Sequence, residues 1–167
     1  MQPSRRDAII GIAATASAAA TSAAAKAKTS VLDGRDSTDL AALVKSKQVS
    51  ATELLDAAIA RAEALNPRFN FMAQKHYDFA RKAIADGLPE GPFTGVPWLL
   101  KDLSTYVAGE LTENGSRFYK GNRATVTSEL VTRIQRAGFV IFGKTTSPEF
   151  GLTPTTENKL TGDTRNP

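Results

Sequence analysis

Two short apolar runs on either side of a helix-like segment limit the fold of this 167-residue chain more than any other feature. Residues 98–100 (Trp-Leu-Leu) and 139–142 (Phe-Val-Ile-Phe) are uninterrupted apolar stretches next to proline or glycine, as is typical of strands buried on both faces. Between them, the apolar residues of 130–137 recur at helical spacing, and Gly138 follows as a helix-ending glycine. Strand, helix and strand in this order predict a parallel pair with a right-handed crossover, and therefore an α/β fold.

The polar residues that follow each predicted strand are the first candidates for a site. The carboxyl ends of parallel strands meet at one edge of a sheet, where open α/β sheets bind ligands. This edge carries Lys101 and Asp102 after the first strand and residues 143–146 (Gly-Lys-Thr-Thr) after the second. Burial of Lys101 at a strand end favours the neutral amine, which can accept a proton, whereas the adjacent Asp102 favours the ammonium. The sequence leaves that balance open, and an exposed Lys-Asp pair is the alternative.

The remaining segments are expected to form helices and loops around this strand pair. Ser50 and Glu53 have the spacing of a capping box at the start of a helix that runs to about Leu65, where Asn66-Pro67 is expected to stop it. The other expected elements are a helix from about Asp36 capped by Ser37 or Thr38, a strand at 69–73, a helix at 77–85, a long irregular segment at 104–122, and a cap at Thr125 or Thr127 for the helix that contains 130–137.

Composition excludes several kinds of site. The chain has no cysteine, which excludes disulfides, thiolate metal sites and a cysteine nucleophile, and a single histidine excludes a histidine-rich metal site. That histidine, His76, lies at a polar helix entry and is expected on the surface. The net charge of +4 is spread in ones and twos, so no nucleic-acid partner is expected. Lys144 lies in Gly-Lys-Thr but lacks the earlier glycine of a phosphate loop, and we expect it to be structural.

Residues 1–27 differ from the rest of the chain. Ser4-Arg5-Arg6-Asp7 is a basic start, residues 8–25 are rich in alanine and weakly hydrophobic, and small residues around Ala25 suit a cleavage site. This layout predicts an export signal of the twin-arginine type, a mature domain from residue 28 to 167, and a periplasmic location. Serines and threonines within the run argue against a stable membrane anchor. The alternative is an alanine-rich tail on a cytoplasmic protein.

Six sequence blocks, in the same order, resemble the opening part of the amidase signature family. The resemblance covers about Leu40 to Pro167. It rests on the blocks at 95–102 (Gly-Val-Pro-Trp-Leu-Leu-Lys-Asp), 115–116 (Gly-Ser), 131–138 (Val-Thr-Arg-Ile-Gln-Arg-Ala-Gly), 143–151 (Gly-Lys-Thr, then Pro-Glu-Phe-Gly), 156–158 (Thr-Glu-Asn) and 162–167 (Gly-Asp-Thr-Arg-Asn-Pro).

The resemblance implies a fold, a chemistry and a role for two residues. The fold would be the N-terminal part of an α/β/α sandwich with a mixed central sheet, incomplete in this chain. The chemistry would be hydrolysis of carboxamides by a Ser, cis-Ser, Lys triad, in which Lys101 acts through the middle serine as the base. Asp102 would be a supporting residue that helps to place the lysine. The substrate would be a small-molecule amide, no metal, nucleotide or flavin cofactor is implied, and a homodimer of the full-length protein is left open.

The same resemblance implies that the serines of the triad lie beyond Pro167. In the family, a Gly- and Ser-rich segment after Asn-Pro supplies both serines and the oxyanion amides, and residues 1–167 contain no such segment. Ser104, Ser116 and Ser147 are not in a matching motif. We therefore expect an N-terminal fragment of a longer amidase, inactive alone, with an unpaired sheet edge and exposed apolar faces. The alternative is a non-catalytic α/β binding or interaction module derived from an amidase.

Two features favour one branch of the family over another. The export signal argues against the subunit that releases ammonia from glutamine in cytoplasmic transamidation. Residues 98–103 resemble stand-alone amidases, including those that act on cyclic or linear oligoamides.

Overall fold

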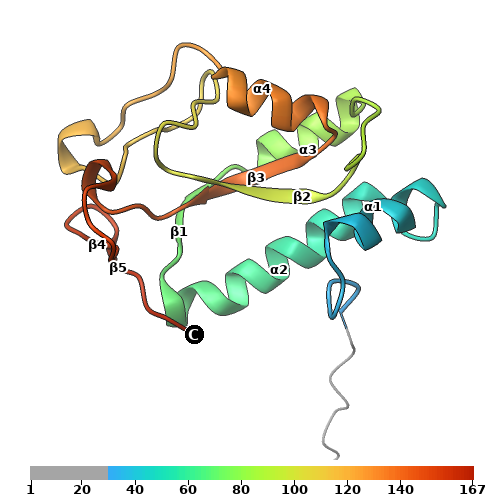
Figure 1. Ribbon diagram of the computed structural model, residues 1–167, viewed down its shortest axis with the longest axis horizontal. Coiled ribbons are helices and arrows are strands. Elements are labelled where there is room, and N and C mark those ends of the chain that lie inside the picture. The colour runs from blue at the N-terminus through green and yellow to red at the C-terminus, as the bar shows by residue number, and fades with distance from the viewer. Residues whose placement is uncertain (1–29) are drawn as a thin grey trace, which may run out of the picture.

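The computed structural model describes residues 30–167, which form a three-stranded sheet with helices packed around it (Figure 1). The predicted export signal lies outside the described residues. In chain order the elements are α1 (Ser37–Lys45), α2 (Ala51–Phe69), β1 (Met72–Lys75), α3 (Tyr77–Asp86), β2 (Pro97–Lys101), the 3₁₀ helix η1 (Arg117–Tyr119), α4 (Glu129–Arg136), β3 (Val140–Thr145), the 3₁₀ helix η2 (Glu149–Gly151), β4 (Glu157–Asn158) and β5 (Gly162–Asp163).

The sheet is mixed, with β3 at its centre. Its strand order is β1-β3-β2, and β1 runs antiparallel to β3. β2 runs parallel to β3, with Pro97 opposite Val140 and Lys101 opposite Thr145. The parallel pair predicted from the two apolar runs is therefore confirmed, and both strands end at the same edge.

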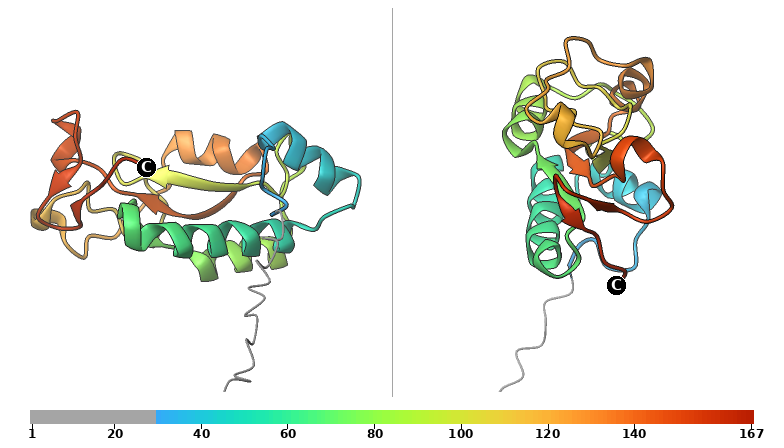
Figure 2. Two further views of the ribbon diagram at one scale, coloured as in Figure 1. Left: turned by 90° about the horizontal axis from the view of Figure 1, so that it is seen from below. Right: turned by 90° about the vertical axis from the view of Figure 1, so that its left-hand side faces the viewer.

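Helices cover both faces of the sheet because successive residues of the strands point to opposite sides. Val140 and Phe142 are buried in a cluster with residues of α2 and α3. Leu100 and Ile141 are buried in a second cluster with Val131 of α4. Figures 1 and 2 show α2 and α4 on opposite sides of the sheet. Apolar burial on both faces is what stabilises a sheet of this kind.

Helix α2 begins as predicted but ends later. Ser50 and Glu53 form the expected capping box, in which each side chain accepts a hydrogen bond from the other residue's backbone N–H. The expectation that Asn66-Pro67 stops the helix is wrong, because α2 continues to Phe69 with Pro67 inside it. The helix ends where Asn70 adopts a left-handed conformation, with φ of 52°. The following strand consequently lies at 72–75 instead of 69–73.

Two other helices have their capping residues one or a few positions away from those predicted from the sequence. Asp36 caps α1, and its Oδ1 accepts hydrogen bonds from the backbone N–H groups of Thr38 and Asp39, so the expected cap at Ser37 or Thr38 is wrong. Ser128 is the residue at the start of α4, in place of Thr125 or Thr127. Thr127 instead accepts a hydrogen bond from Ala108 N at 3.1 Å, which ties the long irregular segment to the start of the helix.

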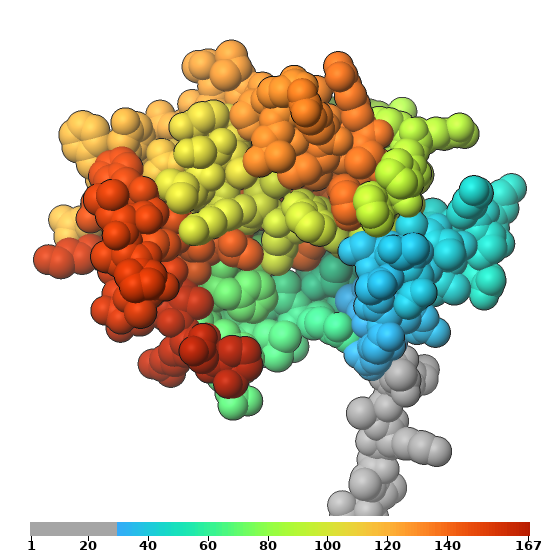
Figure 3. Space-filling view, viewed as in Figure 1, coloured from blue at the N-terminus to red at the C-terminus, as the bar shows by residue number. Residues whose placement is uncertain are grey.

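Strand β2 is not buried on both faces along its length, which corrects the sequence prediction. Leu100 is 2% exposed, but Trp98 is 37% exposed. Within residues 30–167, β2 has a hydrogen-bonded partner strand on one side only, which is β3. Trp98 lines a groove of about 450 Å³ together with residues of α2 such as Leu65, and Figure 3 shows the hollow between β2 and α2. No helix of this described part has the length and apolar character needed to cross a membrane.

Candidate active site at the carboxyl edge of the sheet

The carboxyl ends of β2 and β3 lie side by side, as the sequence predicted. Lys101 pairs with Thr145 at the last position of the ladder, and Asp102 N donates a hydrogen bond to Thr145 O at 2.9 Å. The irregular segment after β2 and the segment containing η2 gather at the same end of the molecule (Figure 1). The two longest irregular parts of residues 30–167 therefore meet at this edge.

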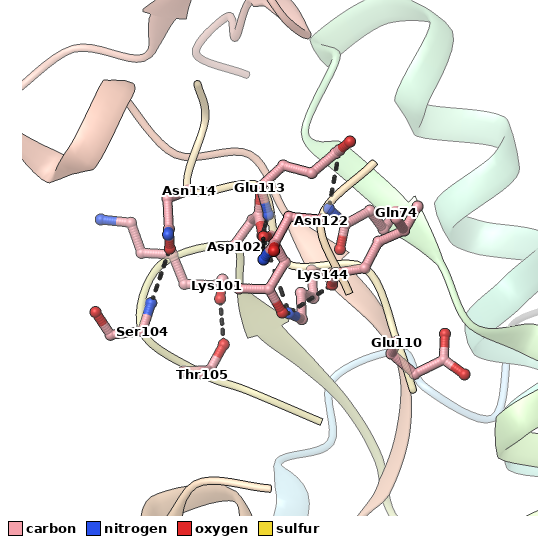
Figure 4. Close-up of polar contacts among 12 residues, drawn as sticks. Gln74, Lys101, Asp102, Ser104, Thr105, Glu110, Glu113, Asn114, Asn122 and Lys144 are labelled. Atoms are coloured by element: carbon pink, nitrogen blue, oxygen red, sulfur yellow. Dashed lines mark hydrogen bonds and ion pairs between the residues drawn. The ribbon is translucent and has the colours of Figure 1, made fainter. Parts of the chain in front are cut away.

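Lys101 is exposed at this edge. Its backbone carbonyl accepts a hydrogen bond from the Thr105 hydroxyl. Its side chain lies on the face opposite to Leu100 and Asp102, because residues alternate along the strand, and Figure 4 shows it leading away from Lys144. Residues 30–167 do not bury Lys101, so the desolvation that the sequence suggested for this amine does not come from the described part of the chain.

Asp102 is buried, with 1% of its surface exposed, and holds the irregular segment in place. Its Oδ1 accepts a hydrogen bond from Glu113 N at 3.0 Å, and its Oδ2 accepts one from Gly115 N at 3.3 Å. The same carboxylate lies 3.9 Å from Lys144 Nζ. The Asp102 side chain thus ties residues 113–115 to the end of β2, directly after Lys101.

Lys144 is fully buried, at the centre of a polar cluster beneath the irregular segment (Figure 4). Its ammonium donates a hydrogen bond to Leu111 O at 2.8 Å and another to the Thr112 hydroxyl. Burial lowers the pKa of Lys144 to about 8, although the nearby carboxylates of Asp102, Glu110 and Glu113 oppose this shift. The sequence suggests burial of Lys101, whereas in the structure Lys144 is the enclosed lysine. The available signal was that Lys144 continues the apolar run of the central strand.

Glu113 connects this cluster to its surroundings. Its Oε1 accepts a hydrogen bond from Gly121 N at 2.6 Å, and its Oε2 accepts one from Gln74 Nε2 of β1 at 3.2 Å. Asn122 Nδ2 donates to Thr112 O at 2.9 Å. The middle of the irregular segment is therefore held against the sheet by Gln74, and residues 121 and 122 are tied to this middle part by hydrogen bonds within the segment.

His76 is buried, with 4% of its surface exposed, which corrects the prediction of a surface residue. Its backbone N–H donates to Phe142 O at 3.0 Å, so the end of β1 draws the imidazole under the irregular segment, where Nε2 lies 3.6 Å from Glu110 Oε2. Burial lowers the pKa of His76 to about 4, and the positive charges of Lys144 and Arg123 act in the same direction. A helix entry that looks polar in sequence is here covered by a segment remote in the chain.

Unusual backbone conformations gather around this edge. Ser104, Asn114 and Phe150 all have positive φ, between 51° and 57°. Asn114 joins the other two, because its Oδ1 accepts a hydrogen bond from Ser104 N at 3.3 Å and its carbonyl accepts one from Phe150 N at 3.0 Å. Residues held in sparsely populated conformations cluster at functional sites, so this concentration is consistent with a site here.

The serines near the edge are engaged in structural hydrogen bonds or are exposed. Ser116 is buried, and its hydroxyl donates to Glu149 Oε1 at 2.6 Å and accepts from Phe118 N. Ser147 is buried and donates to Pro148 O at 3.0 Å. Ser104 is exposed. The geometry gives none of these three hydroxyls a hydrogen bond to a lysine amine.

A protein-family model described as Amidase matches residues 53–167. The chain belongs to the amidase family. It is 42% identical over 135 residues to a 6-aminohexanoate-cyclic-dimer hydrolase of Paenarthrobacter ureafaciens, an alignment that covers 80% of this chain and 27% of that protein. It is 38% identical over 133 residues to a putative amidase AmiC of Mycobacterium tuberculosis, covering 79% of this chain and 28% of the relative.

Solved amidase structures show the same partial match. The structure of a 6-aminohexanoate cyclic dimer hydrolase complexed with substrate superposes with a TM-score of 0.75 at 41% identity, and the match covers 79% of this chain and 27% of that one. A bacterial aryl acylamidase of the amidase signature family gives a TM-score of 0.71 at 34% identity, covering 79% and 29%. The predicted mixed α/β fold of an amidase is therefore confirmed, and this chain spans less than a third of the length of these relatives.

Proposed function

We propose that residues 1–167 form the lysine-bearing part of an amidase that hydrolyses carboxamide C–N bonds, with Lys101 as the base. The observation that carries the proposal is the position of Lys101. It ends β2 beside the carboxyl end of β3, at an edge lined by unusual backbone conformations, in a chain that belongs to the amidase family. An exposed amine at such an edge is accessible to a nucleophile and a substrate supplied by other parts of an enzyme.

The proposed chemistry is acyl transfer through a serine. Lys101 takes a proton from the nucleophilic serine by way of a second serine, while the serine oxygen attacks the amide carbon. The proton then passes to the leaving nitrogen as the C–N bond breaks. Water hydrolyses the resulting ester to release a carboxylic acid and regenerate the serine. In this proposal Asp102 supports Lys101 by tying residues 113–115 to the end of β2.

Residues 1–167 contain no Gly- and Ser-rich segment that would supply the two serines of this mechanism. We therefore further propose that these residues alone do not hydrolyse amides. The substrate in the proposal is a small-molecule amide. Similarity to a cyclic-dimer hydrolase supports an oligoamide or cyclic amide as the first to try. Export through a twin-arginine signal, with a periplasmic location, and a homodimer of the full-length protein are parts of the same proposal that rest on the sequence.

The test is turnover by the full product of the gene that encodes these residues. We expect ammonia or amine release from simple aliphatic amides or from the cyclic dimer of 6-aminohexanoate, loss of this activity in Lys101→Ala, and retention in Lys75→Ala, which removes an exposed lysine paired with Glu63. Release of amine by residues 1–167 alone would refute the proposal that these residues need serines from another part of the enzyme. Full activity in Lys101→Ala would show that the base lies elsewhere.

A second function is favoured by the exposure of Lys101, whose side chain the described residues do not bury. In that case the chain is a non-catalytic α/β module that binds a partner or small molecule. The reading frame after Pro167 discriminates the two. A Gly- and Ser-rich segment soon after this residue supports the hydrolase, and a stop codon there supports the module.

A further inference from the structure

Asn70, the residue at the end of α2, binds the chain at residues 161–164. Its Nδ2 donates hydrogen bonds to Thr161 O at 2.7 Å and to Asp163 O at 3.1 Å. Its backbone carbonyl accepts a hydrogen bond from the Thr164 hydroxyl at 2.8 Å. Figure 1 accordingly shows the C-terminal end of the chain next to the end of α2. One residue thus connects two segments that are more than ninety positions apart.

Thr164 extends this connection to the edge that carries the proposed base. Its hydroxyl lies 2.7 Å from the hydroxyl of Thr146, which is buried. Thr146 directly follows Thr145, the last residue of β3, and Thr145 is the ladder partner of Lys101. Thr146 N also donates to Phe71 O at 2.8 Å, next to Asn70. The position of Thr164 is therefore fixed relative to the end of β3 and to Lys101.

The backbone of Asn70 does not by itself require an asparagine. Asn70 ends α2 in the left-handed conformation, with φ of 52° and ψ of 53°. Glycine adopts this conformation most readily, and asparagine is one of the few other residues that tolerate it. Glycine would therefore end the helix as well, whereas the two contacts to Thr161 and Asp163 need the side-chain amide.

Resting on the proposed function, in which a segment after Pro167 supplies the serines, we propose that Asn70 is a positioning residue for amide hydrolysis. It holds Thr164 against Thr146 and so sets where the chain continues towards the serines, relative to Lys101. Pro167 follows Thr164 by three residues, which span at most about 11 Å, so a displacement of Thr164 is passed on to the chain beyond. A misplacement of about 1 Å between reacting groups can lower a rate by about 100-fold.

The experiment compares Asn70→Gly with the wild type in the full product of the gene. This change keeps the left-handed turn and removes both Nδ2 donors. We expect kcat per folded molecule to fall by about 10–100-fold and KM to change by less than about threefold, because Asn70 acts on the position of the serines and not on substrate binding. Lys47→Gly is the matched control, since exposed Lys47 also has a left-handed backbone, with φ of 58°, and it should leave both constants unchanged.

Hydrogen exchange provides a second measurement that needs no catalytic activity. The backbone N–H groups of Thr164 and Arg165 donate to Thr156 O and Phe69 O, both at 2.9 Å, and should exchange slowly in the wild type. In Asn70→Gly we expect faster exchange in residues 161–165, as read by peptide mass spectrometry. Lys47→Gly should leave this exchange unchanged.

A disulfide offers a rescue that replaces the lost contacts. Thr146→Cys and Thr164→Cys place two thiols where the hydroxyl oxygens are 2.7 Å apart, in residues that otherwise contain no cysteine. Added to Asn70→Gly, the oxidised pair should restore kcat to within about threefold of the wild type, and reduction by dithiothreitol should remove the gain. The cysteine pair with Asn70 intact controls for the loss of the two hydroxyls.

The outcomes separate this inference from the proposed function. Unchanged exchange in Asn70→Gly, faster exchange with unchanged kcat, or a formed disulfide that leaves kcat low would each overturn the inference. If Asn70→Gly does not fold, Thr164→Val, which removes the bridging hydroxyl, should show the same two changes, and their absence counts against it. Full turnover in Lys101→Ala would instead sink the proposed function, while exchange in residues 161–165 still shows whether Asn70 holds this segment.

Discussion

The Lys144 ammonium lies 3.9 Å from Asp102 Oδ1, and both side chains are almost completely withdrawn from solvent. The pair connects the central strand β3 to the turn that ends β2. Exposed ion pairs of this chain, such as that between Lys75 and Glu63, lack this enclosure.

Removal of one partner of the buried pair should lower the free energy of unfolding. Lys144→Met leaves the Asp102 carboxylate buried without a cation, and we expect the free energy of unfolding to fall by about 3–5 kcal/mol. Urea denaturation measures this change. Lys75→Met, at an exposed pair, should change it by less than about 1 kcal/mol. The double variant with Asp102→Asn should be more stable than Lys144→Met alone, and a double variant of lower stability would contradict the pairing.

Substitution of Lys101 should separate folding from activity. Because the side chain is exposed, Lys101→Ala should alter the free energy of unfolding by no more than about 0.5 kcal/mol. In the full product we expect turnover to fall by about 10²–10⁴-fold, which is the usual contribution of a general base. Denaturation curves and initial rates on the same preparation check both statements. A large loss of stability would mean that the activity loss says nothing about catalysis.

Burial of neutral His76 should make stability depend on acid pH. The pKa of His76 is about 4 in the folded protein against 6.5 in the unfolded chain, so the unfolded chain takes up the proton first as the pH falls. The stabilisation is present above pH 6.5 and is lost as the pH decreases towards 4, by about 2–3 kcal/mol in total.

The measurement for His76 is unfolding free energy at several pH values between about 7.5 and 4.5. His76→Gln, which does not titrate, should show a shallower dependence over this window. Equal slopes for the variant and the wild type would assign the acid sensitivity to other groups.

Gly115 should tolerate no side chain. It has φ of 65°, and a Cβ atom there would lie 2.3 Å from Ser147 O. Gly115→Ala therefore requires the backbone around η2 to move, and we expect a loss of at least about 2 kcal/mol in unfolding free energy. Gly109→Ala is the matched control, since Gly109 has φ of 83° but open space around the added atom, and it should cost about 1 kcal/mol. Equal losses of unfolding free energy in the two variants would show that the backbone near Ser147 moves away from the added Cβ atom without a measurable loss of stability.

Local patterns predicted much of the fold, because they depend on neighbours in sequence. The capping box of Ser50 and Glu53, the apolar runs of β2 and β3 and the glycine at 138 are each recognised within a few residues. The end of α2 was mispredicted because Pro67 removes only one donor, and the left-handed Asn70 decides where the helix stops.

The site was harder to predict, because burial there comes from a segment that folds back from elsewhere in the chain. Residues of the irregular segment 104–122 cover His76 and Lys144. Nothing next to His76 in sequence indicates this cover, and the local signal for Lys144 is only that it continues the apolar run of its strand. Lys101 ends a strand that has one partner strand within residues 30–167 and is exposed, whereas Lys144 lies in the central strand and is enclosed. The meeting of the two strand ends at one edge was predictable from topology alone, and it is confirmed.

The strand order affects how the chain can fold during its synthesis on the ribosome. β1 and β2 leave the ribosome before β3, and neither is hydrogen-bonded to the other. The backbone N–H and C=O groups of both strands that pair with β3 remain unpaired until residues 140–145 have been synthesised and take their place between them. Until then the edges of β1 and β2 remain open to mispairing, because a long-range pairing of this kind forms slowly.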